Sequence, residues 1–499
     1  MMSPRLFDWL RSAIGGKRAL ILLLVLPGMA FENSPGCFSE TGTGTIIMDV
    51  PGLPLVADLN TGESIPVTRE TPAGTIKRNL KLISIRHAWQ PDYHIEQNPD
   101  HRTLLKAVVT VEVSGEKAAL LHRPYQMPVS VNGLRLYVET TKTWSTQVQI
   151  AEMDLRKDTR LSLCAEGESW GPEGMVFPIK DYRWRSSSYN NTWSALVPYN
   201  LLYYHRGEDF GAIPGRLEVM AALEGRIVTT PLPGGDGDSN IIRIQTARGF
   251  TLRYAHMNIE TIANNLTAGA EVKRGQVMGK TGATWKGKPQ QHNDPHLHFD
   301  FHFHDSPISA YPAMIEAYFN TFPDEVLAVA GGYHFALPGE PVELDASRSI
   351  ARPGRKIGSF RWILHDQQQI DSAQVTVQFD QPGLYSEELI VKTEGGAEDR
   401  DFAQIRVFDP ERGRKMAAGW CYYTPVRGIH SGSPVLFWNR LWNTTAPVMV
   451  HFGDGSAVQP IQDELAHTYG QPGFYTVTFS SQGPEQEPVT VKLKVVVKD

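Results

Sequence analysis

Apolar and polar residues alternate in short runs along most of the chain, and residues with turn propensity separate these runs. The clearest examples are residues 105–113 and 134–139. A period of two is typical of a strand that buries one of its faces. Residues 241–246 and 250–255 repeat the pattern on both sides of residues 248–249, Arg-Gly, which predicts a hairpin. The sequence therefore predicts an all-β protein built from antiparallel sheets.

The length of the chain, 499 residues, exceeds what one hydrophobic core usually serves and predicts several domains. Turn residues continue to interrupt the strand pattern throughout, and one boundary is expected after Tyr318. We expect a linker over residues 31–43, a β-rich domain over 44–189, a central domain over 190–322, and two further β domains over 323–409 and 410–499.

The N-terminal thirty residues have the pattern of an export signal. Basic residues at positions 11, 17 and 18 precede an apolar run over 19–26, and small residues at 28–30 offer a cleavage site. The apolar run is shorter than the roughly 20 residues that a membrane-spanning helix needs. We therefore expect a signal peptide over residues 1–30, with an uncleaved anchor as the alternative. Either implies a periplasmic, cell-surface or secreted protein.

Charge and cysteine content bear on the possible partners of the protein and on its disulfides. The net charge is −6 and no dense Lys/Arg patch occurs, which argues against nucleic acid as a partner. Three Cys leave one unpaired, and Cys164 and Cys421 fall in different expected domains. Free buried thiols are therefore expected, rather than a disulfide between these two.

Histidines are concentrated in one short stretch. Five of the 16 His occupy positions 292, 296, 298, 302 and 304. Leu297 and Phe299 alternate with His296 and His298, so on a strand both imidazoles point to the same face. A strand holds side chains firmly, as a metal site requires.

A second candidate stretch contains His205 and Asp209, four positions apart around Gly207 in a segment without helical periodicity. An extended or turning backbone could bring both side chains to one point. Two His and one carboxylate form a three-ligand set, which zinc uses when its fourth position stays open for water or substrate. A set of satisfied core histidines is the structural alternative.

Taken in order, His-x-x-x-Asp from His205, Tyr-Ala-His ending at His256 and His-Leu-His-Phe from His296 resemble the M23 family of zinc metallopeptidases, of the lysostaphin and LytM type. The resemblance covers about residues 201–319 and includes the Gly-containing hairpin pattern of residues 270–282. It implies an antiparallel β-sheet metallopeptidase core over residues 190–322.

The resemblance also implies the role of each residue. His205, Asp209 and His298 are expected to bind Zn²⁺, and His256 and His296 to be catalytic histidines that do not bind it. Zinc lowers the pKa of bound water and polarises a scissile carbonyl. One of the two catalytic His would accept a proton from that water, and the other would hydrogen-bond the developing oxyanion. The sequence leaves open which does which.

Several neighbours have less certain roles. Asp300 stands where the family commonly has Glu, and could orient a ligand His through a hydrogen bond. A solvated carboxylate at the strand end is the preferred interpretation. His292, His302 and His304 are expected at the rim. The polar residues 286–295 precede His296, where the family usually has a Ser/Thr-Gly-rich segment. This difference concerns substrate choice rather than chemistry.

The C-terminal part contains a weak internal repeat. Residues 381–385, Gln-Pro-Gly-Leu-Tyr, recur as residues 471–475, Gln-Pro-Gly-Phe-Tyr. Together with 342–347 and 450–455 they resemble PKD domains, which are small immunoglobulin-like sandwiches. Such modules act as spacers or bind cell-wall, glycan or protein surfaces, and a fold alone assigns no function.

The resemblance thus implies an exported zinc-dependent endopeptidase that hydrolyses peptide cross-links of bacterial peptidoglycan, flanked by an N-terminal β-rich domain and two PKD-like sandwiches. Two alternatives stay open. One is a catalytically silent LytM-like scaffold that binds cell wall or partner proteins, and the other is a secreted protease for Gly-rich proteins. Two roles are open for the N-terminal domain: it covers the zinc site, or it serves to position substrate or as a spacer.

Overall fold

The computed structural model describes most of the chain after the expected signal. The described residues are 37–40, 46–49, 53–71, 74–91, 102–147, 155–198, 202–235, 241–288, 294–303, 306–409, 411–412 and 415–499. All described residues belong to one compact unit, residues 36–499. The predicted signal over residues 1–30 lies outside the described residues. Among the described helices, none has the length and apolar character needed to span a bilayer.

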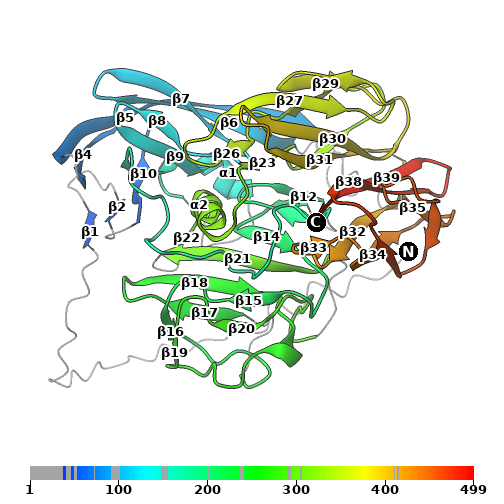
Figure 1. The fold of residues 1–499 in the computed structure, drawn as a ribbon. Coiled ribbons are helices and arrows are strands. Elements are labelled where there is room, and N and C mark those ends of the chain that lie inside the picture. Colours follow the sequence, from blue (N-terminus) through cyan, green and yellow to red (C-terminus); the bar gives the residue numbers. More distant parts are fainter. Residues whose placement is uncertain are drawn as a thin grey trace, which may run out of the picture. The chain divides into compact units, whose positions relative to one another are not determined.

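Strands dominate the described residues from end to end, which confirms the all-β prediction (Figure 1). In the N-terminal part, one antiparallel sheet has the order β1-β2-β3-β10-β9-β8 and a second has the order β4-β5-β6-β7. Their bounds are β1 Cys37–Glu40, β2 Ile46–Asp49, β3 Leu55–Leu59, β4 Ser64–Thr71, β5 Gly74–Pro91, β6 Arg102–Val113, β7 Glu116–His122, β8 Val129–Val131, β9 Leu134–Thr141 and β10 Thr159–Ala165. A short helix, α1 Lys142–Gln147, follows β9.

The two predicted N-terminal strands are present as β6 and β9. In β6 the side chains of Val109, Val111 and Val113 are fully buried, and those between them are not. They belong to the same apolar cluster as Leu134 and Leu136 of β9. The alternation in the sequence therefore marks the face that packs into the core between the two sheets.

The central part, green in Figure 1, is built on an antiparallel sheet of order β11-β14-β21-β18-β17-β16-β19, with β22 added beside β21. Two-stranded pairs β12-β13 and β15-β20 accompany it. The bounds are β11 Asn190–Asn191, β12 Leu196–Pro198, β13 Leu202–Tyr204, β14 Glu208–Gly211, β15 Glu218–Met220, β16 Gly225–Ile227, β17 Ile242–Gln245, β18 Phe250–Ala255, β19 Glu271–Val272, β20 Val277–Lys280, β21 His296–Phe303 and β22 Ser306–Ile308. The predicted hairpin is confirmed as β17 and β18.

Two helical elements in this part were not predicted from the sequence. The first is a 3₁₀ turn, η2 Ile259–Thr261, and the second is the helix α2 Tyr311–Thr321. Nearly all residues of α2 are buried, with Pro312 at its start. A helix buried on nearly all sides shows only a weak amphipathic period, which is the pattern by which helices are recognised in a sequence.

The C-terminal part, yellow to red in Figure 1, contains a mixed sheet of order β24-β31-β30-β39-β38-β35-β36, with β27, β28 and β33 attached, and smaller sheets β23-β26, β25-β29 and β32-β34-β37. The bounds are β23 Val326–Leu327, β24 Tyr333–Ala336, β25 Val342–Asp345, β26 Ile350–Ala351, β27 Ile357–Ile363, β28 Gln369–Ile370, β29 Gln374–Val377, β30 Gly383–Thr393, β31 Glu398–Val407, β32 Ala418–Thr424, β33 Ile429–His430, β34 Pro434–Trp442, β35 Val448–His451, β36 Gln459–Ile461, β37 Glu464–Thr468, β38 Gly473–Gln482 and β39 Pro488–Lys498.

The sequence repeat corresponds to the same local structure in both copies. The Tyr385 hydroxyl donates a hydrogen bond to the carbonyl of Gln381, and the Tyr475 hydroxyl donates one to the carbonyl of Gln471. In both copies the tyrosine thus pins the turn that precedes its strand, β30 or β38. The repeated residues therefore serve the fold, as expected.

A buried ion pair connects the two C-terminal copies. Lys494 of β39 and Asp399 of β31 approach to 2.7 Å, and both side chains are nearly excluded from solvent. Burial raises the pKa of Asp399 even though Lys494 opposes the shift. The charged form of Asp399 in the folded protein therefore depends on Lys494.

We predict that Lys494→Met lowers the free energy of unfolding by about 3 kcal/mol at neutral pH, because it leaves a buried carboxylate without its cation. Without Lys494 the pKa of Asp399 rises further above its value in the unfolded chain. The loss should therefore be smaller at pH 5 and grow as the pH rises. Urea unfolding followed by circular dichroism measures both effects.

Two control variants make this test specific. Asp399→Asn added to Lys494→Met should recover part of the loss, because no charge is then buried. Arg361→Met removes one partner of the exposed Arg361–Asp371 pair and should leave unfolding unchanged. An equal loss in the single and double variants would show that packing, not charge, explains the effect.

Candidate metal and active site

The strand β21 forms the centre of the candidate site, because the strands on both sides of it contribute residues. Across the β14–β21 pair, Asp209 lies opposite His298. Across the β18–β21 pair, Ala255 lies opposite His298, so the next residue, His256, emerges beside it. Antiparallel register thus brings three segments that are distant in sequence to one point.

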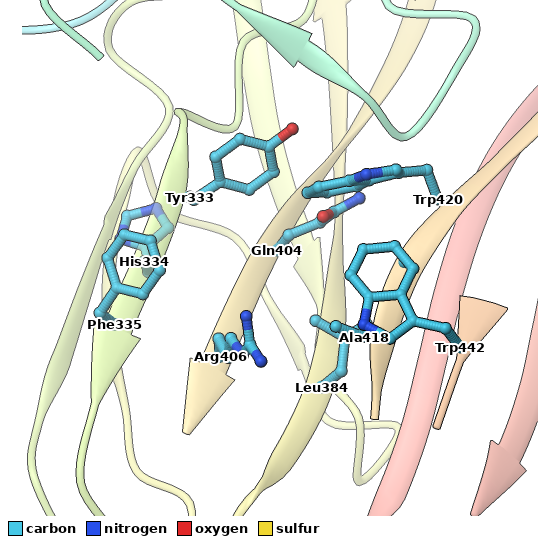
Figure 2. Close-up of a pocket in the computed structure, with 10 residues that line it drawn as sticks. Tyr333, His334, Phe335, Leu384, Gln404, Arg406, Ala418, Trp420 and Trp442 are labelled. Atoms are coloured by element: carbon cyan, nitrogen blue, oxygen red, sulfur yellow. The ribbon is translucent and has the colours of Figure 1, made fainter. Parts of the chain in front are cut away.

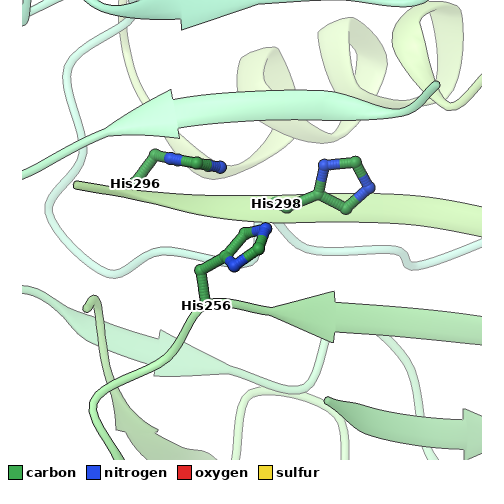
Figure 3. A group of neighbouring side chains, drawn as sticks. All are labelled: His256, His296 and His298. Atoms are coloured by element: carbon green, nitrogen blue, oxygen red, sulfur yellow. The ribbon is translucent and has the colours of Figure 1, made fainter. Parts of the chain in front are cut away.

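Successive side chains of β21 point alternately into the core and toward the candidate site. Leu297 and Phe299 are fully buried in the central apolar cluster. His296 and His298 therefore lie on the other face, as the sequence predicts. Figure 3 shows their rings above the same strand, with His256 reaching them from the end of the neighbouring strand.

His205 reaches this face through a tight turn at Gly207. Gly207 has a φ of +98°, in the left-handed region that favours glycine. A Cβ atom there would lie 2.7 Å from the carbonyl oxygen of Phe299 and 2.9 Å from Nε2 of His298. The backbone therefore passes so close to β21 that no side chain fits, which explains the glycine between His205 and Asp209.

The three residues predicted as zinc ligands are brought together. Nε2 of His205 lies 3.1 Å from Nδ1 of His298 and 3.1 Å from Oδ2 of Asp209. Nδ1 of His298 lies 2.9 Å from Oδ1 of Asp209. All three side chains are buried. Two imidazole nitrogens and a carboxylate converging in this way could hold a divalent metal ion.

Electrostatics keep the carboxylate of this group ionised. Burial alone would raise the pKa of Asp209, but the charges of His205 and His296 and hydrogen bonds from His205 and His298 outweigh burial. They hold the pKa of Asp209 well below its usual range. A deprotonated carboxylate is the form that binds a metal.

The two predicted catalytic histidines lie beside the cluster. The ring of His256 has its centroid 4.7 Å from that of His296 and 6.0 Å from that of His298. Nε2 of His296 lies 3.3 Å from Oδ1 of Asp209. All five residues singled out in the sequence are therefore contiguous.

Backbone carbonyls fix the tautomers of His256 and His296. Nδ1 of His256 lies 2.9 Å from the carbonyl oxygen of Thr284, and Nδ1 of His296 lies 2.5 Å from that of Asp294. A carbonyl can only accept, so each Nδ1 carries the hydrogen and each neutral ring keeps a lone pair on Nε2. Both residues are thus set up to accept a proton at Nε2.

A second group of ligand atoms overlaps the first. His256, His296 and His298 also offer nitrogen atoms close enough together for one metal ion. This group contains no carboxylate, whereas the group with Asp209 carries a negative charge to offset a divalent cation. The donor set of His205, Asp209 and His298 is therefore better suited to a divalent metal ion.

Asp300 differs from the preferred sequence interpretation, which was a solvated carboxylate. It is fully buried, and its Oδ2 lies 2.8 Å from Nε2 of His298. Arg253 donates to the same oxygen from 2.8 Å. Burial would raise the pKa of Asp300, but Arg253 and His298 hold it well below its usual range. Asp300 therefore fixes the ring of His298 so that Nδ1 faces the cluster.

Of the three histidines predicted at the rim of the site, only His302 is among the described residues. His302 is half-buried, with Nε2 2.9 Å from Oδ1 of Asp300, so it supports that carboxylate rather than standing apart at a rim. His292 and His304 lie outside the described residues.

Tyr189 and Asn191 are site residues that the sequence reasoning missed. The Tyr189 hydroxyl and the Asn191 amide donate to Oδ2 of Asp209 from 3.0 and 2.9 Å. They come from a segment around β11, which pairs with β14. Neither residue belongs to a motif in the sequence. Only the strand pairing reveals them, because a Tyr and an Asn in a turn-rich stretch carry no signal of their own.

Comparisons with known proteins agree with this geometry. Residues 203–310 match the model of peptidase family M23, and residues 325–407 match that of the PKD domain. The PKD match covers the first of the two expected copies. No curated protein matches the chain.

Two solved bacterial structures match parts of the chain. One, from Ruminococcus gnavus, is provisionally described as a glycyl-glycine endopeptidase, LytM. It is 23% identical with a TM-score of 0.23, and the match covers 29% of this chain and 60% of that one. The fibronectin(III)-like modules of Clostridium thermocellum CbhA are 11% identical with a TM-score of 0.14, covering 35% of this chain and 94% of theirs. Both TM-scores are low.

The family matches confirm the resemblance found in the sequence. The match to peptidase family M23 includes all five of the clustered residues, from His205 to His298. Residues 203–310 are thus a peptidase domain of family M23, and residues 325–407 are a PKD domain.

Proposed function

We propose that the protein is an exported, zinc-dependent endopeptidase that cleaves peptide cross-links of bacterial peptidoglycan. The observation that carries the proposal is the convergence of His205, Asp209 and His298 on one point, with His256 and His296 beside them. A silent scaffold would not need all five, so the convergence favours an enzyme. The family resemblance supports the wall substrate, and the signal-like residues 1–30 support export.

The proposed mechanism divides the work among these side chains. Zinc, when bound, would lower the pKa of a water and polarise the scissile carbonyl. Asp209, His205 and His298 would hold the metal. His256 or His296 accepts a proton at Nε2, the nitrogen that its backbone hydrogen bond leaves with a lone pair. The other histidine can then donate a hydrogen bond to the oxygen that gains charge.

The substrate could reach the site past Trp285. Its ring stacks on that of His256 at 5.5 Å between centroids, and its side chain remains 42% exposed. An exposed aromatic ring against a catalytic side chain provides a flat apolar surface for a peptide. We assign it to substrate positioning.

We predict that His298→Ala loses both zinc and activity, because it removes one of three protein ligands. His296→Gln should keep zinc and lose about 10²- to 10⁴-fold in rate, because it removes only a proton-transfer group. Zinc content by elemental analysis and peptide release from purified peptidoglycan measure the two effects. His451→Ala is the matched control, since His451 is exposed on β35, and should change neither.

The same assay separates the alternatives. A wild-type protein without zinc would contradict the proposal and favour the scaffold. A protein that holds zinc but leaves peptidoglycan intact while cutting a Gly-rich polypeptide would contradict the wall substrate alone. Zinc removal by a chelator should abolish cleavage, and added zinc should restore it.

We also predict that Asp300→Asn weakens zinc binding by about 10- to 100-fold, although Asp300 is not itself a proposed ligand. The amide cannot hold the His298 ring as the carboxylate does. Competition with a fluorescent chelator measures the affinity. Glu271→Gln, at an exposed position of β19 in the same sheet, is the control. Equal affinities of Asp300→Asn and the wild type would remove Asp300 from the site.

A further inference from the structure

A pocket outside the metal site lies where β24, β30 and β31 meet β32 and β34. Its volume is about 360 Å³, including the space open to solvent. Figure 2 shows Tyr333 and Phe335 on one side, Trp420 and Trp442 on the other, and Gln404 and Arg406 between them. The pocket joins the matched PKD domain, residues 325–407, to the second copy.

The walls of this pocket are flat and apolar. The ring of Trp420 lies 5.2 Å from that of Tyr333 and 6.3 Å from that of Trp442, measured between centroids. The Trp420 ring is almost fully buried, while Tyr333 and Trp442 are half-buried. Aromatic faces partly open to solvent pack well against aliphatic groups of a ligand.

Arg406 introduces a positive charge into these surroundings. Among the described residues no carboxylate forms an ion pair with its guanidinium, which instead stacks over Phe408 at 5.0 Å. Its buried Nε has no hydrogen-bond partner. Burial lowers the pKa of Arg406 to about 10, which still leaves it charged at neutral pH. Arg406 as a whole is half-buried, so an anion that enters the pocket can pair with its guanidinium.

Gln404 adds a hydrogen-bond acceptor. It lies two residues before Arg406 on β31, so both side chains share one face of the strand. Its Nε2 donates to the carbonyl of Ser188 at 2.8 Å, which fixes the amide orientation. Its Oε1 is buried and has no donor. The pocket therefore offers one cation without a carboxylate beside it and one acceptor without a donor among the described residues.

We propose that this pocket binds the carboxyl-terminal end of a peptide. The terminal carboxylate would pair with Arg406, the last peptide N–H would donate to Oε1 of Gln404, and a small apolar side chain would lie between Tyr333 and the two tryptophans. A neutral sugar would leave the charge of Arg406 unmatched, and an inorganic anion would leave the aromatic walls unused.

The pocket is connected to the metal site through one segment. Trp420 packs on Tyr189 at 5.2 Å between ring centroids, and Tyr189 lies 5.0 Å from His296. Ser188, which accepts from Gln404, also accepts from the backbone N–H of Cys421 through its hydroxyl. If the proposed function holds, the bound peptide end belongs to the substrate. Peptide binding itself does not depend on that function.

Calorimetric titration of the full zinc-loaded chain with N-acetyl-alanyl-alanine tests this proposal, with the same peptide bearing a terminal amide as the control ligand. We expect the amide to bind at least 10-fold more weakly. Arg406→Gln should weaken binding of the acid by a similar factor, and Arg406→Lys should restore most of it. Arg440→Gln is the matched control, because Arg440 also stacks on an aromatic ring, that of Trp438, but pairs with Asp463, and it should change nothing.

The titration is repeated with His298→Ala, which alters the metal site and leaves the pocket intact. Unchanged binding there supports the pocket even if no cleavage is ever found, so the two proposals can fail separately. Binding that disappears in His298→Ala, or that is equal for acid and amide, overturns the assignment, as does an absence of binding. If Arg406→Gln does not fold, judged by its thermal unfolding, Trp442→Ala at the pocket edge should weaken binding instead.

Discussion

The candidate site depends on the hydrogen-bonded register of three antiparallel strands. β21 is flanked by β14 and β18, and His298 lies opposite a residue of each. A slip of one residue in either pair would turn the side chains involved to the opposite face. The close passage of the backbone at Gly207 and the buried side chains of Leu297 and Phe299 oppose such a slip. The core packing that fixes the sheet therefore also fixes the distances between the candidate ligands.

The polar groups around His298 form a layered network. Asp209 contacts the ring at Nδ1 and Asp300 contacts it at Nε2, and these carboxylates raise the pKa of His298 although burial alone would lower it. Arg253 in turn neutralises Asp300. A ring held at both nitrogens has one orientation, which limits the entropy lost when a ligand binds. A metal at Nδ1 would compete with a proton for that atom.

Much of the site could be predicted from the sequence, because its residues belong to compact motifs on regular strands. The alternation in β21 predicts correctly that His296 and His298 share a face, and the hairpin before His256 is present. Their assignment as ligands or proton acceptors stays a prediction. Asp300 was misjudged because a carboxylate near a strand end is usually solvated, and the sequence does not show that Arg253 lies opposite it.

Other parts could not be predicted, since they depend on contacts between distant segments. The helix α2 is buried on nearly all sides, and Tyr189 and Asn191 acquire their role only through the pairing of β11 with β14. The latter two residues also precede the segment that matches the peptidase family, which begins at residue 203. A fragment cut at that boundary would lack two donors to Asp209, and water would take their place. The segment that the family model matches is thus smaller than the set of residues that determines how readily the Asp209 carboxylate accepts a proton.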